Sequence, residues 1–172
     1  MKWLAALLAV AFLAGCASAP RPAAGTWTSG QLTLRVEPTA ERSAQSLSAS
    51  FDLQGSAERG ELRLTSALGL QVAAASWGPG EAILTTSQGS ARFDNLLELS
   101  RQALGEDVPL AALPDWLAGR PWAGAPSAAL PAGFEQLGWR VDLARRAEGR
   151  VEARRATPPA VTLRVRLDTP AP

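Results

Sequence analysis

The most informative absences in this chain of 172 residues are histidine and tyrosine, which do not occur, and cysteine, which occurs once, as Cys16. Without histidine there is no Ser-His or Cys-His nucleophile pair and no histidine metal site. The single lysine is Lys2, close to the N-terminus, so a serine–lysine pair is also excluded from the folded part. The sequence has neither a glycine-rich phosphate loop nor a metal-ligand spacing. These absences predict a protein that is not an enzyme and holds no metal or cofactor.

Charge of either sign is not in excess, because 17 Lys and Arg stand against 16 Asp and Glu. This balance argues against nucleic acid as a partner. Carboxylate chemistry such as that of glycosidases needs paired acids, and here Glu106 and Asp107 are adjacent in a predicted turn, where solvation accounts for them. Eight arginines fall between Arg140 and Arg166. A solvated strand face explains them, and contact with an acidic partner or lipid headgroups is the alternative.

The N-terminus has the features of an export signal. Lys2 precedes an apolar run of ten residues, 4–13, whereas a membrane-spanning helix needs about 20. The stretch 13–16 (LAGC) resembles the bacterial lipobox, in which the cysteine is acylated before cleavage. We therefore predict a lipoprotein signal peptide over residues 1–15 and a lipid anchor at Cys16. An ordinary signal peptide cut a few residues later is the alternative.

Residues 16–25 (CASAPRPAAG) are small and Pro-rich and show no periodicity, which predicts a lipidated, flexible tether. The remaining residues, 26–172, are enough for one folded domain with its own core. Ala17 and Ser18 follow the cysteine, without the aspartate that resembles an inner-membrane retention signal. The predicted location is therefore the periplasmic face of the outer membrane.

From Trp27 onward the apolar residues alternate with polar ones, which is typical of strands with one dry and one wet face. The alternation is clearest in residues 31–36 (QLTLRV), 46–53 (SLSASFDL) and 61–65 (ELRLT). Further short strands are predicted at 70–77, 81–86, 90–93, 138–143, 150–155 and 161–168. Short strands joined by tight turns indicate an antiparallel meander.

Between residues 94 and 118 the period changes to that of a helix. A first helix is predicted to begin after Asp94 or Asn95 and to stop at Gly105. Its apolar stripe consists of Leu96, Leu97 and Leu104. A second short helix follows Pro109, with Leu110, Leu113, Trp116 and Leu117 at three- and four-residue spacing. The Ala- and Pro-rich stretch from there to Gly133 is predicted to be weakly ordered.

This order of elements resembles the LolB family of outer-membrane lipoprotein receptors. The likeness runs from about Trp27 to Pro121, and it rests on the strand-like segment 53–69 (LQGSAERGELRLTSALG) and the helical segment 106–121 (EDVPLAALPDWLAGRP). The resemblance implies a mainly β fold with α: an open antiparallel β-barrel, or half-barrel, whose short helical lid covers a cavity for acyl chains. Members often have a helix before the first strand, which residues 17–25 are too short to form, so the cavity is expected to be more open there.

The resemblance also implies roles for particular residues. The acyl-chain cavity would be lined by inward residues Leu32, Leu34, Phe51, Leu53, Leu62 and Leu64, and the lid would consist of Leu96, Leu97, Leu113, Trp116 and Leu117. Leu68, in a predicted turn where polar residues are usual, corresponds to an exposed residue that drives cargo into the membrane. From the residues alone, the strand leucines could equally form the core of a sandwich, and Leu68 could fold back onto it.

The function implied is that of an outer-membrane lipoprotein that receives lipoproteins from a LolA-like periplasmic carrier and inserts them into the outer membrane. The expected partners are this carrier, the acyl chains of the cargo and the membrane itself, and the chain is expected to be a monomer. The alternative is a non-catalytic structural lipoprotein that scaffolds an envelope complex. A packed interior favours the scaffold, whereas a hollow of several hundred Å³ favours a ligand site, which typically measures about 300–1,000 Å³.

Overall fold

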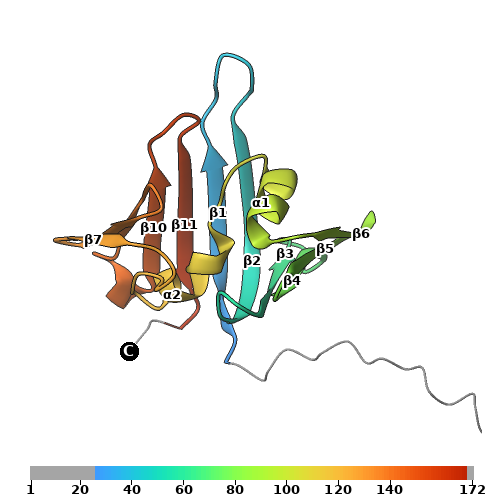
Figure 1. Ribbon diagram of the computed structural model, residues 1–172, viewed down its shortest axis with the longest axis horizontal. Coiled ribbons are helices and arrows are strands. Elements are labelled where there is room, and N and C mark those ends of the chain that lie inside the picture. The colour runs from blue at the N-terminus through green and yellow to red at the C-terminus, as the bar shows by residue number, and fades with distance from the viewer. Residues whose placement is uncertain (1–25, 170–172) are drawn as a thin grey trace, which may run out of the picture.

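A computed structural model describes residues 26–169, in which the strands form one open antiparallel sheet with helices on one face (Figure 1). The predicted signal peptide, Cys16 and the tether lie outside the described residues. Within the described part of the chain, no helix is long and apolar enough to cross a membrane.

The sheet has eleven strands over residues 26–169, in the spatial order β6-β5-β4-β3-β2-β1-β11-β10-β9-β8-β7. Their bounds are β1 Thr28–Val36, β2 Gln45–Gly55, β3 Gly60–Thr65, β4 Gln71–Gly78, β5 Glu81–Thr86, β6 Gly89–Phe93, β7 Ser127–Leu130, β8 Gly133–Gln136, β9 Trp139–Asp142, β10 Arg150–Arg155 and β11 Val161–Leu167. The first strand joins the last, with Leu34 opposite Leu163, so the two halves of the chain share one sheet. The edge strands β6 and β7 do not pair with each other, which confirms the predicted half-barrel.

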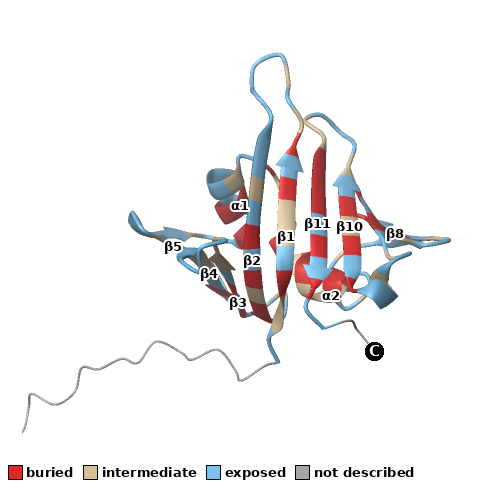
Figure 2. Cartoon of the chain, turned by 180° about the vertical axis from the view of Figure 1, so that it is seen from behind, coloured by how far each residue is buried: buried red, intermediate tan, exposed pale blue. Residues whose placement is uncertain are grey.

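The sheet separates an apolar face from a polar one because side chains alternate along each strand. On β1, Leu34 and Val36 are buried, whereas Arg35 points outward. On β11, Val161, Leu163, Val165 and Leu167 are all buried, while Arg164 and Arg166 are exposed. Figure 2, drawn from behind, shows these alternating buried and exposed positions along β1, β10 and β11.

The helices lie over the apolar face (Figure 1). They are α1 (Leu96–Leu104), the 3-10 turn η1 (Leu110–Ala112) and α2 (Leu113–Leu117), and a further 3-10 turn, η2 (Arg146–Glu148), precedes β10. Helix α1 begins as predicted, because the Asn95 side chain accepts a hydrogen bond from the Glu98 amide at 2.9 Å. It ends at Gly105, whose φ of 69° suits glycine.

Two details of the predicted elements are wrong. The stretch predicted to be weakly ordered up to Gly133 contains β7, which pairs with β8 as a terminal hairpin. The apolar stripe on α1 was also misassigned, because Leu97 is 44% exposed and the buried face consists of Leu96, Leu99 and Ser100. Positions three and four residues after Leu96 return to the same face of a helix, whereas the next residue does not.

Candidate functional site

The residues predicted to line a cavity do lie together on the inner face of the sheet. Leu53 pairs with Leu62 across β2 and β3, and Phe51 pairs with Leu64 two residues along. Four members of the set are buried, namely Leu34, Phe51, Leu53 and Leu62, and the other two, Leu32 and Leu64, are partly buried against them. The strand register therefore builds one continuous apolar floor.

Most of the predicted lid belongs to the same buried cluster as this floor. Leu96, Leu113, Trp116 and Leu117 are buried in the same hydrophobic cluster as the strand residues. Leu97 is the exception, since it lies on the outer side of α1. In this structure, therefore, four of the five predicted lid residues contact the interior as part of one packed core.

Trp116 is the centre of the lid. Its ring lies 6.2 Å from that of Trp139 and 6.3 Å from that of Phe134, measured between centroids. Its indole Nε1 donates to Oε1 of Gln136 at 2.8 Å, and Gln136, only 2% exposed, also donates to the carbonyl oxygens of Trp122 and Ala125. A buried amide with its hydrogen bonds made fixes the lid to β8. Sequence reasoning missed this anchor because it did not predict β8 as a separate strand.

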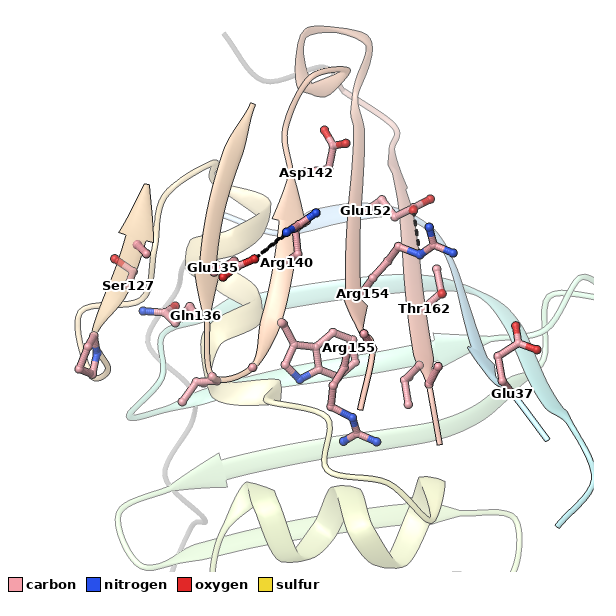
Figure 3. A pocket seen from close by; sticks show the side chains of 18 residues that line it. Glu37, Ser127, Glu135, Gln136, Arg140, Asp142, Glu152, Arg154, Arg155 and Thr162 are labelled. Carbon is pink, nitrogen blue, oxygen red and sulfur yellow. Dashed lines mark hydrogen bonds and ion pairs between the residues drawn. The ribbon is translucent and has the colours of Figure 1, made fainter. Parts of the chain in front are cut away.

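An apolar groove of about 170 Å³ reaches the floor between α1 and the β1–β2 pair. It is lined by Leu34, Val36, Leu47, Ala103 and Leu104, with Gln45 and Ser46 at its border. A larger groove, of about 1010 Å³, lies over the strands of the C-terminal half (Figure 3). Another, of about 620 Å³, lies over β10 and β11 and reaches Gln31 and Thr33 of β1. More than half of the lining residues of each are charged or polar. Of the residues predicted to line the cavity, Leu34 borders one of these three grooves, and the others pack with Leu96, Leu113, Trp116 and Leu117 in one hydrophobic cluster.

Glu106 is the one acid whose surroundings contradict the sequence-based interpretation. Solvation was expected to explain it, yet Glu106 is only 6% exposed. One carboxylate oxygen accepts from Nη2 of Arg42 at 2.8 Å, and the other accepts from Nη2 of Arg155 at 2.5 Å. Its neighbour Asp107 is only partly buried and pairs with Arg101, whose hydrogen bond holds the pKa of Asp107 below its usual value. The pattern of the sequence contains no signal for this difference.

Leu68 is 86% exposed, in the turn between β3 and β4. The Gly69 amide donates to the Ser66 carbonyl oxygen at 2.9 Å, and the Ser66 amide donates to the Leu70 carbonyl oxygen at 2.8 Å, which closes the turn. Leu70 and Val72 just beyond it are also exposed, at 65% and 41%. Leu68 therefore does not fold back onto the core, and the apolar tip comprises three residues, Leu68, Leu70 and Val72.

Three of the eight C-terminal arginines lie on the outer face of the sheet in ion pairs with carboxylates. Arg140 pairs with Glu135, as Figure 3 shows, while Arg154 and Arg164 share Glu152. All three arginines are well exposed, so these pairs contribute little to stability. This arrangement agrees with a solvated strand face. Among the described residues, no group of three or more His, Cys, Asp or Glu is placed to hold a metal ion.

A sequence model of the family described as "Outer membrane lipoprotein LolB" matches residues 28–169, which is nearly all of the described chain. The chain belongs to the LolB family. The resemblance seen in the first half of the chain thus extends through the final strands.

Curated relatives agree with this assignment to the LolB family. A Bordetella petrii protein is 36% identical over 83% of this chain and 77% of its own length. A Bordetella pertussis protein is 34% identical over 84% of this chain and 80% of its own length, and a Chromobacterium violaceum protein is 30% identical over 83% and 82%. Each of the three is named outer-membrane lipoprotein LolB.

Proposed function

We propose that this chain is an outer-membrane lipoprotein, anchored by lipid at Cys16 and facing the periplasm, that receives lipoproteins from a LolA-like carrier and inserts them into the outer membrane. The observation that carries the proposal is that one LolB-family chain has both a helical lid and an exposed apolar turn. A helical lid covers an apolar sheet face, and a leucine that folding does not bury projects from the turn between β3 and β4.

The acyl chains of the cargo are proposed to replace the lid as the cover of the apolar floor. Leu113, Trp116 and Leu117 are buried in the same cluster as the floor, so the proposal requires them to move aside when an acyl chain binds. Each methylene withdrawn from water contributes about 0.8 kcal/mol, so a long chain offsets the loss of several lid contacts. The groove beside Leu34 and Leu104 is the place where an acyl chain meets the floor first.

Transfer of this kind needs no covalent step and no nucleotide. The direction comes from differences in affinity between the carrier, this protein and the bilayer. The exposed tip of Leu68, Leu70 and Val72 is proposed to enter the membrane interface and to bring the open lid next to the lipid. In this proposal the floor and the lid take the cargo from the carrier, and the tip brings it to the bilayer. A monomer suffices for this transfer.

A structural scaffold is the second candidate, and the packed interior is the observation that favours it. A scaffold, however, has no use for an exposed leucine in a short turn. The two functions differ in whether the interior ever accepts an acyl chain.

A transfer assay with purified components tests the proposal. A soluble Cys16→Ala form is mixed with a carrier loaded with a lipidated protein, and the cargo is followed by co-purification and by mass spectrometry of bound lipid. The proposal expects cargo to move to this protein; the lipid-anchored form on liposomes then passes it to the bilayer. A soluble form that stays free of cargo and lipid at every concentration favours the scaffold.

A further inference from the structure

The linker between α1 and η1, residues 105–109, is held to the rest of the molecule by arginines from separate elements. Arg42 comes from the loop between β1 and β2, and Arg155 is the last residue of β10. Both bind the carboxylate of Glu106, one on each oxygen. Glu106 therefore ties the linker to a loop and to a strand that are far apart in the sequence.

The surroundings of Arg155 show that this contact differs from a surface ion pair. The Arg155 side chain is only 15% exposed, and its guanidinium also donates to the carbonyl oxygens of Asp107 and Pro159. Figure 3 shows Arg155 directed away from the outer-face ion pairs of Arg140 and Arg154. A buried charge pair is costly to break, because each charge separated from its partner must be solvated again or remain unpaired.

The linker directly follows the end of α1, which lines the apolar groove. Ala103 and Leu104, which line the groove, come immediately before the linker, and Nη1 of Arg42 donates to the Gly105 carbonyl oxygen at 3.3 Å. Movement of the linker away from Arg42 would thus widen the groove at its α1 side. The contact of Arg42 with the linker therefore lies next to the groove through which the floor is reached.

We propose that Glu106, Arg42 and Arg155 form a latch that controls how fast an acyl chain reaches the apolar floor. This inference rests on the proposed function and adds three positioning residues to it. The latch does not touch the ligand. It holds the linker closed, so that the apolar floor stays covered until a ligand supplies enough apolar contact to replace the lid.

The binding rate of a neutral hydrophobic probe, N-phenyl-1-naphthylamine, tests the latch by stopped-flow fluorescence on the soluble Cys16→Ala form. Glu106→Gln removes the charge and keeps the size of the side chain. The expected result is an increase in the association rate of about tenfold, which corresponds to a mid-range coupling between contacting residues. Asp107→Asn is the matched control, since it removes a carboxylate from the same linker but only an exposed ion pair, and it should leave the rate unchanged.

Arg42→Gln provides a second variant if Glu106→Gln does not fold. Arg42 is 46% exposed and its loss leaves the Arg155 pair in place, so a smaller increase in rate, about threefold, is expected. A purely structural role of Glu106 would lower the melting temperature without a faster association rate in the folded protein. In the double variant, Arg42→Gln should raise the rate by less than it does in the wild type, because its ion pair with Glu106 is already lost and only its hydrogen bond to the Gly105 carbonyl oxygen remains to be removed.

The outcomes separate the latch from the function on which it rests. Saturable probe binding with the same association rate in the wild type, a folded Glu106→Gln and Arg42→Gln refutes the latch and leaves the proposed function standing. Absence of saturable probe binding in every variant, together with failure to accept cargo, refutes both. An increase in the Asp107→Asn control equal to that of Glu106→Gln also refutes the latch, because the effect would then come from any change in the linker.

Discussion

Replacing Leu68 by glutamate changes the apolar tip without touching the core. About one-seventh of the Leu68 surface is buried in the folded protein. Since full burial of a leucine contributes about 1.5–3 kcal/mol, its contribution to folding is below about 0.5 kcal/mol. A domain of this size shifts in melting temperature by about 2–4 °C per kcal/mol. We therefore expect Leu68→Glu to melt within about 2 °C of the wild type.

The expected effect on delivery to a bilayer is much larger. If the exposed part of Leu68 enters the membrane interface, the substitution forfeits up to about 1.5–3 kcal/mol of apolar burial and adds a carboxylate that water solvates better. At about 1.4 kcal/mol per factor of ten, transfer to liposomes should slow by about 10- to 100-fold. Acceptance of cargo from the carrier should stay near normal, because the apolar floor is unchanged.

The assay measures both steps on the same protein, with acceptance followed by co-purification and delivery by flotation of cargo with liposomes. Leu137→Glu is the matched control, since Leu137 is an exposed leucine in the turn between β8 and β9. Normal delivery by a stable Leu68→Glu protein would refute the role given to Leu68. Equal loss in the Leu137 variant would show that added negative charge, rather than the tip, causes the defect.

Three further substitutions test other parts of the structure. Trp116→Ala should lower the free energy of unfolding, measured in urea, by about 3–5 kcal/mol. The substitution leaves a cavity in the core, and the buried side-chain oxygen of Gln136 loses one of its two hydrogen-bond donors. A loss below about 1 kcal/mol would mean that the lid is not packed as described. Leu97→Glu should cost less than about 2 kcal/mol, because nearly half of Leu97 is already exposed. Leu99→Glu on the buried face of α1 should cost several kcal/mol, and equal costs would contradict the orientation of α1. The pKa of Asp107 is lowered in the folded protein, below its ordinary value of 3.8, so its pair with Arg101 stabilises the fold at neutral pH. This contribution disappears as the pH falls through the lowered pKa. Wild type and Asp107→Asn should therefore differ slightly at pH 7 and converge in melting temperature below pH 3; a difference that grows with acid would contradict the sign.

The sequence alone predicted the features that depend on neighbouring residues. Alternation in segments such as 31–36 indicates a strand because side chains of successive residues point to opposite faces. The start and end of α1 were predictable because Asn95 and Gly105 act on backbone groups within one turn. The same local patterns, in their order along the chain, indicated the LolB family and pointed to Leu68 as an apolar residue in a turn.

Only the tertiary structure decided which residues close the lid and how tightly. Glu106 meets Arg42 and Arg155 across 64 and 49 residues of sequence, and nothing in the linker distinguishes it from its less buried neighbour Asp107. β7 likewise lacks a pattern of its own, and it exists because β8 offers an edge with which to pair. Trp116 packs against Phe134 and Trp139, which lie on β8 and β9, strands that follow it in the chain. Such contacts depend on how distant elements pack, which local periodicity does not encode.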